Sequence, residues 1–350
     1  MKSLPRFAAT LAMSTLLTGY SVSTTLAADD TKLGVVTSFS VLGDLTSRVG
    51  GERVSVSTLV GPGEDAHVYE PTPADAARVA EADVVIVNGL EFEGFIDRLI
   101  EASATKARIV TATSGITPLK AKAHSDDEHD DHDDHAKEGH DDHAEAGQAK
   151  KEHAKKDHDD HDDHGDEEAG HNHGEFDPHA WHAVPNVRNY VATIADGLCA
   201  VDAKGCPTYR SNAQSYTQEL DNLQAEITAT FAAIPKDRRT IIVSHDAFGY
   251  LANAYDLTFL APLGLSTESE ASAADVARLI DQVRKDGASA LFVENVSNPR
   301  LIERIAAETG LEIGGTLYSD ALSDSSGPAS TYLDMMRHNS KTIATAIQGS

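Results

Sequence analysis

Basic residues are few in this chain of 350 residues, which has 29 Lys and Arg against 56 Asp and Glu and a formal net charge of −27. A strongly negative protein repels nucleic acid and attracts cations. The composition therefore argues against a nucleic-acid-binding protein and favours one that captures cations.

The N-terminal apolar stretch, residues 7–17, is too short for a transmembrane helix and is interrupted by polar residues. It follows Lys2 and Arg6 and precedes the small residues Ala27 and Ala28, a pattern typical of a cleaved signal peptide. We therefore expect residues 1–27 to be a signal peptide. No cysteine lies at the cleavage point to carry a lipid, so the sequence predicts a soluble protein of the periplasm.

Cysteine is also scarce, since Cys199 and Cys206 are the two in the whole chain. Their spacing is not usual for zinc and no histidine lies nearby, which makes a metal role the less favoured alternative. In an oxidising compartment two neighbouring cysteines form a disulfide by default. We expect a local disulfide between them.

Histidine, in contrast, is concentrated, with 12 of the 17 between His124 and His173. Residues 124–173 also contain 14 Asp and 6 Glu against 5 Lys, and so supply more than half of the net charge. This tract offers almost no apolar surface to offset the entropy of ordering it, and we expect a disordered insertion. Its repeated Asp-Asp-His units favour auxiliary zinc capture over the alternative of a solvated acidic linker.

Outside the signal peptide and the tract, the chain is long enough for two domains. Short β-branched runs alternate with helical segments, a pattern typical of α/β units with parallel strands. Strands are expected at residues 33–37, 54–60, 83–88, 108–111, 240–244, 257–260, 290–294 and 315–317. Helices are expected at residues 41–49, 73–80, 95–102, 273–285 and 299–309.

A long helix is expected between the two halves, because apolar residues recur at spacings of three and four through residues 208–233. An ordinary surface helix is the alternative. Pro207 suits a first helical turn and Pro235 ends the run. The predicted fold class is α/β, with two (β/α) lobes of Rossmann-like parallel sheet bridged by a long rigid helix. The expected domains are an N-terminal lobe (28–205), a linking helix (206–235) and a C-terminal lobe (236–350).

Four polar residues stand where a functional side chain is expected. In open α/β sheets, ligands bind at the carboxyl ends of the strands. His67, His245 and Asp320 each follow a predicted strand, and His179 comes shortly after the tract. Two of these residues belong to each predicted lobe, which indicates a site in the cleft between the lobes.

Six motifs occur in order along the chain. They are GPGEDAHVYEPTP (61–73), DPHAW (177–181), HDAFGY (245–250), STESE (266–270), ENVSNP (294–299) and YSDALS (318–323). On these motifs the mature chain outside the tract resembles the metal-specific solute-binding proteins of ABC transporters, and among them the zinc binders of the ZnuA and AztC type. The resemblance implies two α/β lobes bridged by a long helix. It also implies one metal between the lobes, with His67, His179, His245 and Asp320 as ligands.

The resemblance implies a monomeric periplasmic protein that binds Zn²⁺ with high affinity and delivers it to a membrane permease. A periplasmic metallochaperone is a further candidate partner. Three imidazoles and one carboxylate suit tetrahedral zinc, whereas members that carry manganese or iron usually replace the third histidine with a carboxylate. A manganese or iron receptor of the same fold is one alternative. A periplasmic zinc buffer or a surface adhesin, without a transporter, is another.

Enzymatic activity is not expected. The sequence has no His-Glu-x-x-His pattern and no spare general base beside the motifs. A closed shell of four protein ligands also leaves no open position on zinc for a reacting water.

The roles of three further residues stay open at this point. Glu294 either orients a ligand imidazole or merely closes a strand. His182 either adds a ligand near the site or lies at the surface. His338, in a late amphipathic segment, is expected to be structural.

Overall fold

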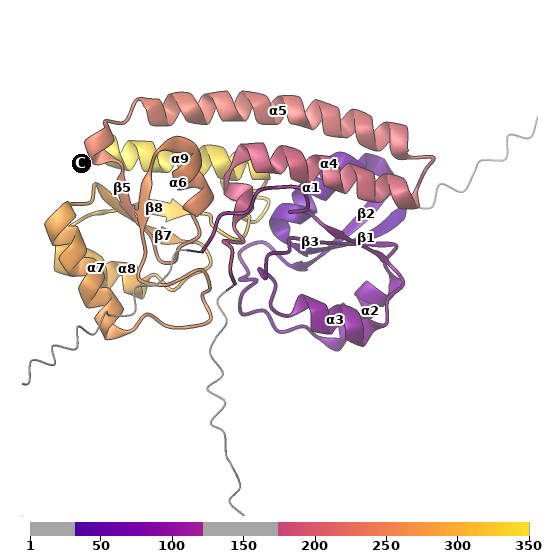
Figure 1. Ribbon diagram of the computed structural model, residues 1–350, viewed down its shortest axis with the longest axis horizontal. Helices are drawn as coiled ribbons and strands as arrows, with labels where there is room; N and C mark the ends of the chain where they lie inside the picture. Colours follow the sequence, from indigo (N-terminus) through magenta and orange to yellow (C-terminus); the bar gives the residue numbers. More distant parts are fainter. Residues whose placement is uncertain (1–31, 122–173, 350) are drawn as a thin grey trace, which may run out of the picture.

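Two lobes, each built on a parallel sheet of four strands, lie side by side, and one long helix runs along both (Figure 1). This computed structural model describes residues 32–121 and 174–349. The predicted signal peptide (1–27) and the histidine-rich tract (124–173) lie outside the described residues. Within the described residues no helix is long and apolar enough to cross a membrane. The predicted α/β class is confirmed.

The first lobe contains a sheet of strand order β2-β1-β3-β4. Its strands are β1 (Leu33–Phe39), β2 (Val54–Val60), β3 (Val84–Val87) and β4 (Arg108–Thr111). Its helices are α1 (Ser40–Gly50), α2 (Pro73–Glu81), α3 (Ile96–Ser103) and α4 (Val184–Val201). In Figure 1, α1 and α4 lie on one face of the sheet and α2 and α3 on the other. A parallel strand covered on both faces reads as a continuous apolar run, as the Val-Val-Ile-Val of β3 does.

The second lobe repeats this plan with strand order β6-β5-β7-β8. Its strands are β5 (Thr240–Ile242), β6 (Thr258–Leu260), β7 (Ala290–Glu294) and β8 (Ile313–Leu317). Its helices are α6 (Gly249–Tyr255), α7 (Ala273–Asp286), α8 (Arg300–Thr309) and α9 (Tyr332–Gly349). In each lobe the strand order reverses at a central strand, β1 or β5. Such a reversal opens a crevice at the carboxyl ends of the strands.

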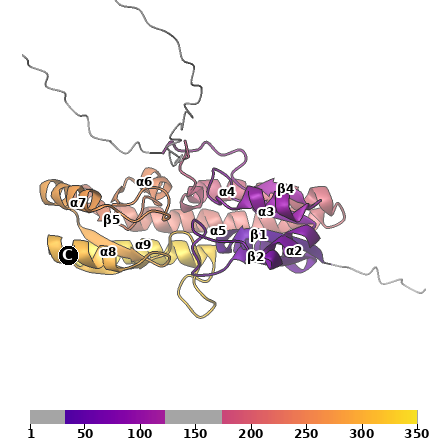
Figure 2. The same ribbon diagram turned by 90° about the horizontal axis from the view of Figure 1, so that it is seen from below.

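Helix α5 (Cys206–Ala232) has 27 residues and spans about 40 Å at 1.5 Å per residue. It packs against α1 and α4 of the first lobe and against α6 and α9 of the second (Figures 1 and 2). The helix ends at Ala232, before the end of the predicted segment 206–235, and a separate 3₁₀ turn (Lys236–Arg238) follows Pro235. At its start, Cys206 forms the expected disulfide with Cys199 at the end of α4.

The lobes share their main apolar core. One continuous cluster of buried residues runs from Phe39 of the first lobe through Leu220 of α5 to Phe248 of the second. Polar contacts cross the same junction, since the Tyr332 hydroxyl donates to the Trp181 carbonyl at 2.8 Å. A shared core and a stiff helix hold the two crevices face to face.

Candidate metal centre

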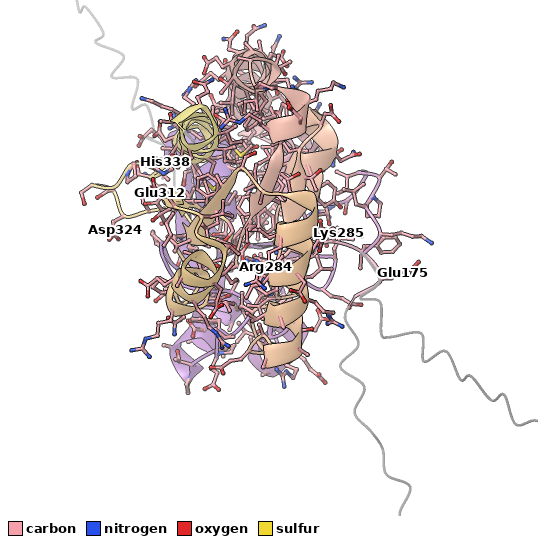
Figure 3. The ribbon with its side chains drawn as sticks, turned by 90° about the vertical axis from the view of Figure 1, so that its left-hand side faces the viewer. Glu175, Arg284, Lys285, Glu312, Asp324 and His338 are labelled. Atoms are coloured by element: carbon pink, nitrogen blue, oxygen red, sulfur yellow. A yellow bond between two sulfur atoms is a disulfide. The ribbon has the colours of Figure 1, made fainter. Side chains whose placement is uncertain are left out.

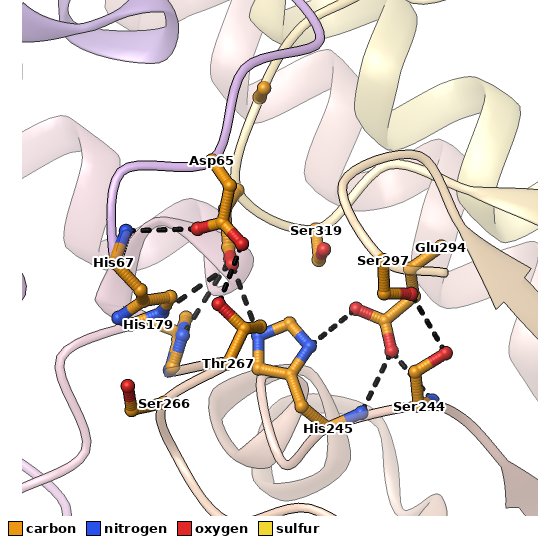
Figure 4. Close-up of polar contacts among 12 residues, drawn as sticks. Asp65, His67, His179, Ser244, His245, Ser266, Thr267, Glu294, Ser297 and Ser319 are labelled. Carbon is orange, nitrogen blue, oxygen red and sulfur yellow. Dashed lines mark hydrogen bonds and ion pairs between the residues drawn. The ribbon is translucent and has the colours of Figure 1, made fainter. Parts of the chain in front are cut away.

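Three imidazoles, labelled in Figure 4, meet the Asp320 carboxylate in the crevice between the lobes. They belong to His67, His179, His245 and Asp320, all buried, and their four ligand atoms lie within 4.8 Å of one another. The distances from the histidine Nε2 atoms to the Asp320 carboxylate are 3.5 Å for His67, 3.6 Å for His179 and 3.1 Å for His245. Ligands at about 2.0 Å from a tetrahedral zinc are about 3.3 Å apart. The spacing suits a single ion.

His67 is positioned by the loop that follows β2. Asp65, two residues earlier, accepts the His67 backbone N–H at 2.9 Å through Oδ1. Its other oxygen accepts the Thr267 hydroxyl of the second lobe at 2.6 Å. The Asp65 carboxylate therefore links the backbone of His67 to the opposite lobe.

His179 repeats this arrangement. Asp177, again two residues earlier, accepts the His179 backbone N–H at 2.9 Å, and the same Oδ1 lies 2.8 Å from Nδ1 of the ring. A carboxylate at Nδ1 fixes the proton there and leaves the Nε2 lone pair available. The ring therefore presents Nε2 to the crevice as a ligand atom.

His245 follows β5 and contacts Glu294 at the end of β7, the neighbouring strand. The Glu294 Oε2 lies 2.6 Å from the His245 Nδ1. Its Oε1 accepts the backbone N–H groups of Ser244 at 2.7 Å and of His245 at 3.0 Å. This geometry matches the predicted alternative in which Glu294 orients an imidazole.

Asp320 lies in the turn after β8, and Asn295 holds the backbone on both sides of it. The Asn295 side chain accepts the N–H of Ser319 at 3.2 Å and donates to the carbonyl of Ala321 at 3.1 Å. The Trp181 indole N–H of the first lobe donates to the Ser319 carbonyl at 3.0 Å. Backbone contacts from both lobes thus fix the carboxylate position.

The ligand atoms pair only with one another in the described part of the chain. The Nε2 atoms of the three histidines form ion pairs with the Asp320 oxygens, but all of these buried atoms lack a hydrogen-bond partner among the described residues. Leaving buried groups without hydrogen bonds is costly, about 1–3 kcal/mol each and more for a charge. A cation between them would satisfy all of these atoms at once.

The protonation states of Asp320 and His245 depend on their charged neighbours in the group. Burial raises the pKa of Asp320, but His245 and His179 outweigh burial and hold that pKa well below its usual value. Burial lowers the pKa of His245, but Glu294 and Asp320 outweigh it and raise that pKa well above its usual value. Without an ion, the site therefore contains an ionised carboxylate and holds a proton on His245.

His182 is not at the surface, so that alternative is wrong. It is fully buried, with its ring 5.6 Å from that of Trp181 and 4.7 Å from that of Phe248. Burial, and then the neighbouring His179, lowers the pKa of His182 to about 4. It is not one of the four clustered ligand residues. Apolar packing keeps this imidazole inside the junction between the lobes.

His338 lies away from this group, on α9. Its Nε2 is 3.0 Å from the carbonyl oxygen of Thr316 in β8, which agrees with the structural role expected from the sequence. Figure 3 shows His338 at the opposite edge of the molecule from Glu175, close to Glu312.

Two orienting aspartates, Asp65 and Asp177, are absent from the sequence-based set. A local signal for them exists, because both stand in an Asp-x-His pattern. Asn295 and Thr267 have no such signal, since their partners are 24 and 202 residues away.

Comparisons with known proteins agree on a metal-transport family. A family model described as zinc-uptake complex component A, periplasmic, matches residues 35–346. The manganese-binding lipoprotein MntA of Halalkalibacterium halodurans is 31% identical over 320 residues, covering 91% of this chain and 90% of MntA. The iron-binding protein YfeA of Yersinia pestis is 26% identical over 313 residues, covering 89% of this chain and 86% of YfeA. The periplasmic zinc binding protein TroA of Treponema pallidum matches in structure with a TM-score of 0.73 and 26% identity, covering 91% of this chain and 99% of TroA.

Proposed function

The chain belongs to the family of periplasmic zinc-uptake component A, the metal-binding solute-binding proteins of ABC transporters, and on that premise we propose that it is a periplasmic zinc receptor. It binds Zn²⁺ with high affinity through His67, His179, His245 and Asp320 and delivers the ion to a membrane permease. The family binds and transports its cargo and is not a family of enzymes.

The preference for zinc is carried by the make-up of the donor set. Three imidazoles and a single carboxylate converge in one group, and Asp177 and Glu294 lie at the Nδ1 atoms of His179 and His245. Zinc accepts this mixture in a closed tetrahedral shell, whereas manganese favours more oxygen ligands. A manganese or iron receptor is the second candidate, because MntA and YfeA are named for those metals.

The histidine-rich tract is proposed to capture zinc near the same crevice. Its two flanks pair with each other, since the Ala121 N–H donates to the Glu175 carbonyl at 3.0 Å and the Asp177 N–H to the Leu119 carbonyl at 2.9 Å. The chain therefore leaves and re-enters the described fold beside Asp177, which contacts His179. Export by a cleaved signal peptide completes the proposal, and the monomeric state and a metallochaperone partner stay predictions.

Trp181 offers a fluorescence signal that reports on the cleft. It is the one tryptophan of the chain, its ring is 5.3 Å from that of His179, and its N–H is bonded next to Asp320. Competitive titration of the mature protein with Zn²⁺ and Mn²⁺, followed by tryptophan fluorescence, should give tighter binding of Zn²⁺. His67→Ala should abolish the tight phase and His338→Ala should leave it intact.

Two results would count against the proposal. Tighter binding of Mn²⁺ than of Zn²⁺ in the same titration, corrected for metal availability, would favour the second candidate. A zinc-loaded protein that fails to stimulate its permease in vesicles would indicate a zinc buffer or adhesin instead of a receptor.

A further inference from the structure

A pocket of about 500 Å³ opens beside the candidate metal centre, and residues of both lobes line it. From the first lobe come Glu91, Phe92 and Asp97 of the segment between β3 and α3 and the start of α3. From the second lobe come Ser266 and Glu268 of the segment before α7. The pocket therefore lies at the seam between the lobes, and His67 is the one donor residue that lines it.

The charge of this pocket has one sign. Its acidic lining residues are Glu91, Glu93, Asp97 and Glu268, and none of its lining residues in the described part of the chain is Lys or Arg. Glu91 and Glu268 are exposed and stand on opposite lobes. A cleft lined by charges of one sign focuses the electric field and attracts ions of the opposite charge.

The backbone that carries Glu91 is strained. Gly89, Leu90 and Glu91 have consecutive positive φ values of 86°, 57° and 62°. The left-handed region costs a residue other than glycine roughly 1–2 kcal/mol, so Leu90 and Glu91 adopt it only because the surroundings impose it. Backbone strain of this kind is typical of functional sites.

Glu93 supplies the constraint. Its fully buried carboxylate accepts the backbone N–H of Asn88 at 2.6 Å and of Gly89 at 3.2 Å, and also the hydroxyl of Ser38. These hydrogen bonds hold the backbone where the strained turn begins, at Asn88 and Gly89. As a result Glu91 lines the pocket, while Phe92 lies against the rings of His67 and His179 at 5.0 and 5.8 Å.

His67 connects the pocket to the donor group. It lines the pocket and is 9% exposed, whereas His179, His245 and Asp320 are 0% exposed. Its Nε2 has no hydrogen-bond partner among the described residues. An ion that arrives through the pocket therefore meets His67 before the other three donors.

We propose that this pocket is the entrance by which a hydrated divalent cation reaches the cleft, with Glu91 and Glu268 attracting it from opposite lobes and His67 accepting it first. The inference rests on the proposed function in one respect, that the cargo is a divalent cation. It does not depend on which metal is preferred. The two glutamates steer the ion electrostatically and are not ligands of the bound state.

The test is the rate of metal capture, measured by stopped-flow mixing of the mature protein with Zn²⁺ and with Mn²⁺ and followed by Trp181 fluorescence. The double variant Glu91→Gln with Glu268→Gln should slow association by about 10-fold, the lower end of the range for electrostatic steering, and leave dissociation unchanged. The difference should shrink at high salt, because screening weakens forces between exposed charges.

The matched control is Glu81→Gln with Glu312→Gln. It removes the same net charge from two exposed residues that do not line the pocket, and Figure 3 shows Glu312 at the edge opposite Glu175. This control should associate at the unmodified rate.

Three outcomes would overturn the inference. The double variant could associate with the ion at the same rate as the control, or it could change only in its dissociation rate. Its association rate could also stay equally far below that of the unmodified protein at high salt. The proposed function fails differently, through tighter equilibrium binding of Mn²⁺ once the affinities are corrected for metal availability. Slower capture of both ions with a preference for Mn²⁺ would therefore keep the entrance and reject the zinc receptor.

Discussion

Glu294 and His245 are held 2.6 Å apart, Oε2 to Nδ1, with both side chains fully buried. The second oxygen of Glu294 accepts backbone N–H groups of Ser244 and His245. One carboxylate therefore sets both the backbone and the ring orientation of His245. A ligand imidazole depends on such a partner for its tautomer and its basicity.

Glu294→Gln should weaken zinc binding by about 10- to 100-fold, the usual effect of removing an orienting partner of a metal ligand. The amide keeps the shape but loses the charge that favours the proton on Nδ1. Titration with Zn²⁺ measures the change, and Glu303→Gln, at an exposed position in α8, is the control. Equal affinities for the two variants would contradict the orienting role.

Zinc binding should release protons. The pKa of His245 is raised well above its usual value in the metal-free site, because Glu294 and Asp320 outweigh the effect of burial. The ion needs a neutral imidazole, so it must displace a proton at every pH below that raised pKa. Affinity should fall as pH falls, and the fall should begin above the ordinary histidine range near pH 6.5. Calorimetry in buffers of different ionisation enthalpy counts the released protons, and a count of zero at neutral pH would show that His245 is already neutral.

Asn295→Ala should lower zinc affinity by about tenfold, since it frees the backbone on both sides of Asp320. Asn253→Ala, at an exposed position in α6, is the control. Thermal unfolding of the metal-free protein separates the two possible roles. If Asn295→Ala lowers stability and leaves affinity unchanged, Asn295 supports the fold and not the position of the carboxylate.

The disulfide should contribute stability without contributing to metal binding. Cys199 and Cys206 join the end of α4 to the start of α5 at one end of the molecule (Figure 1), away from the crevice. Replacing both by Ser should lower the free energy of unfolding by about 2–3 kcal/mol, the entropy of closing a short loop. Denaturant unfolding measures this, and zinc titration should give an unchanged affinity. A loss of affinity would mean that the junction of α4 and α5 influences the crevice.

Much of the fold is predictable because it follows from local patterns. Four-residue runs such as Val84–Val87 are apolar throughout because helices cover both faces of a parallel sheet, and the apolar period of α5 is visible over its whole length. The sequence pattern does not predict α6, because seven residues are too few to establish a helical period. Strand β8 begins at Ile313, two residues before the predicted start. Its first part is not predicted, because Gly314 and Gly315 have a low propensity for β-strands.

By itself the sequence determined which side chains follow strand ends, and therefore that His67, His245 and Asp320 belong to the crevices. It also determined the disulfide, whose partners are seven residues apart. Only the tertiary structure decided that the four donor atoms lie within 4.8 Å of one another, that His182 is buried, and that Glu294 orients His245. The reason is physical, because strand ends are set by local periodicity. The contact of Glu294 with His245, 49 residues away, depends instead on strand register, and the contact of Thr267 with Asp65 depends on how the lobes pack.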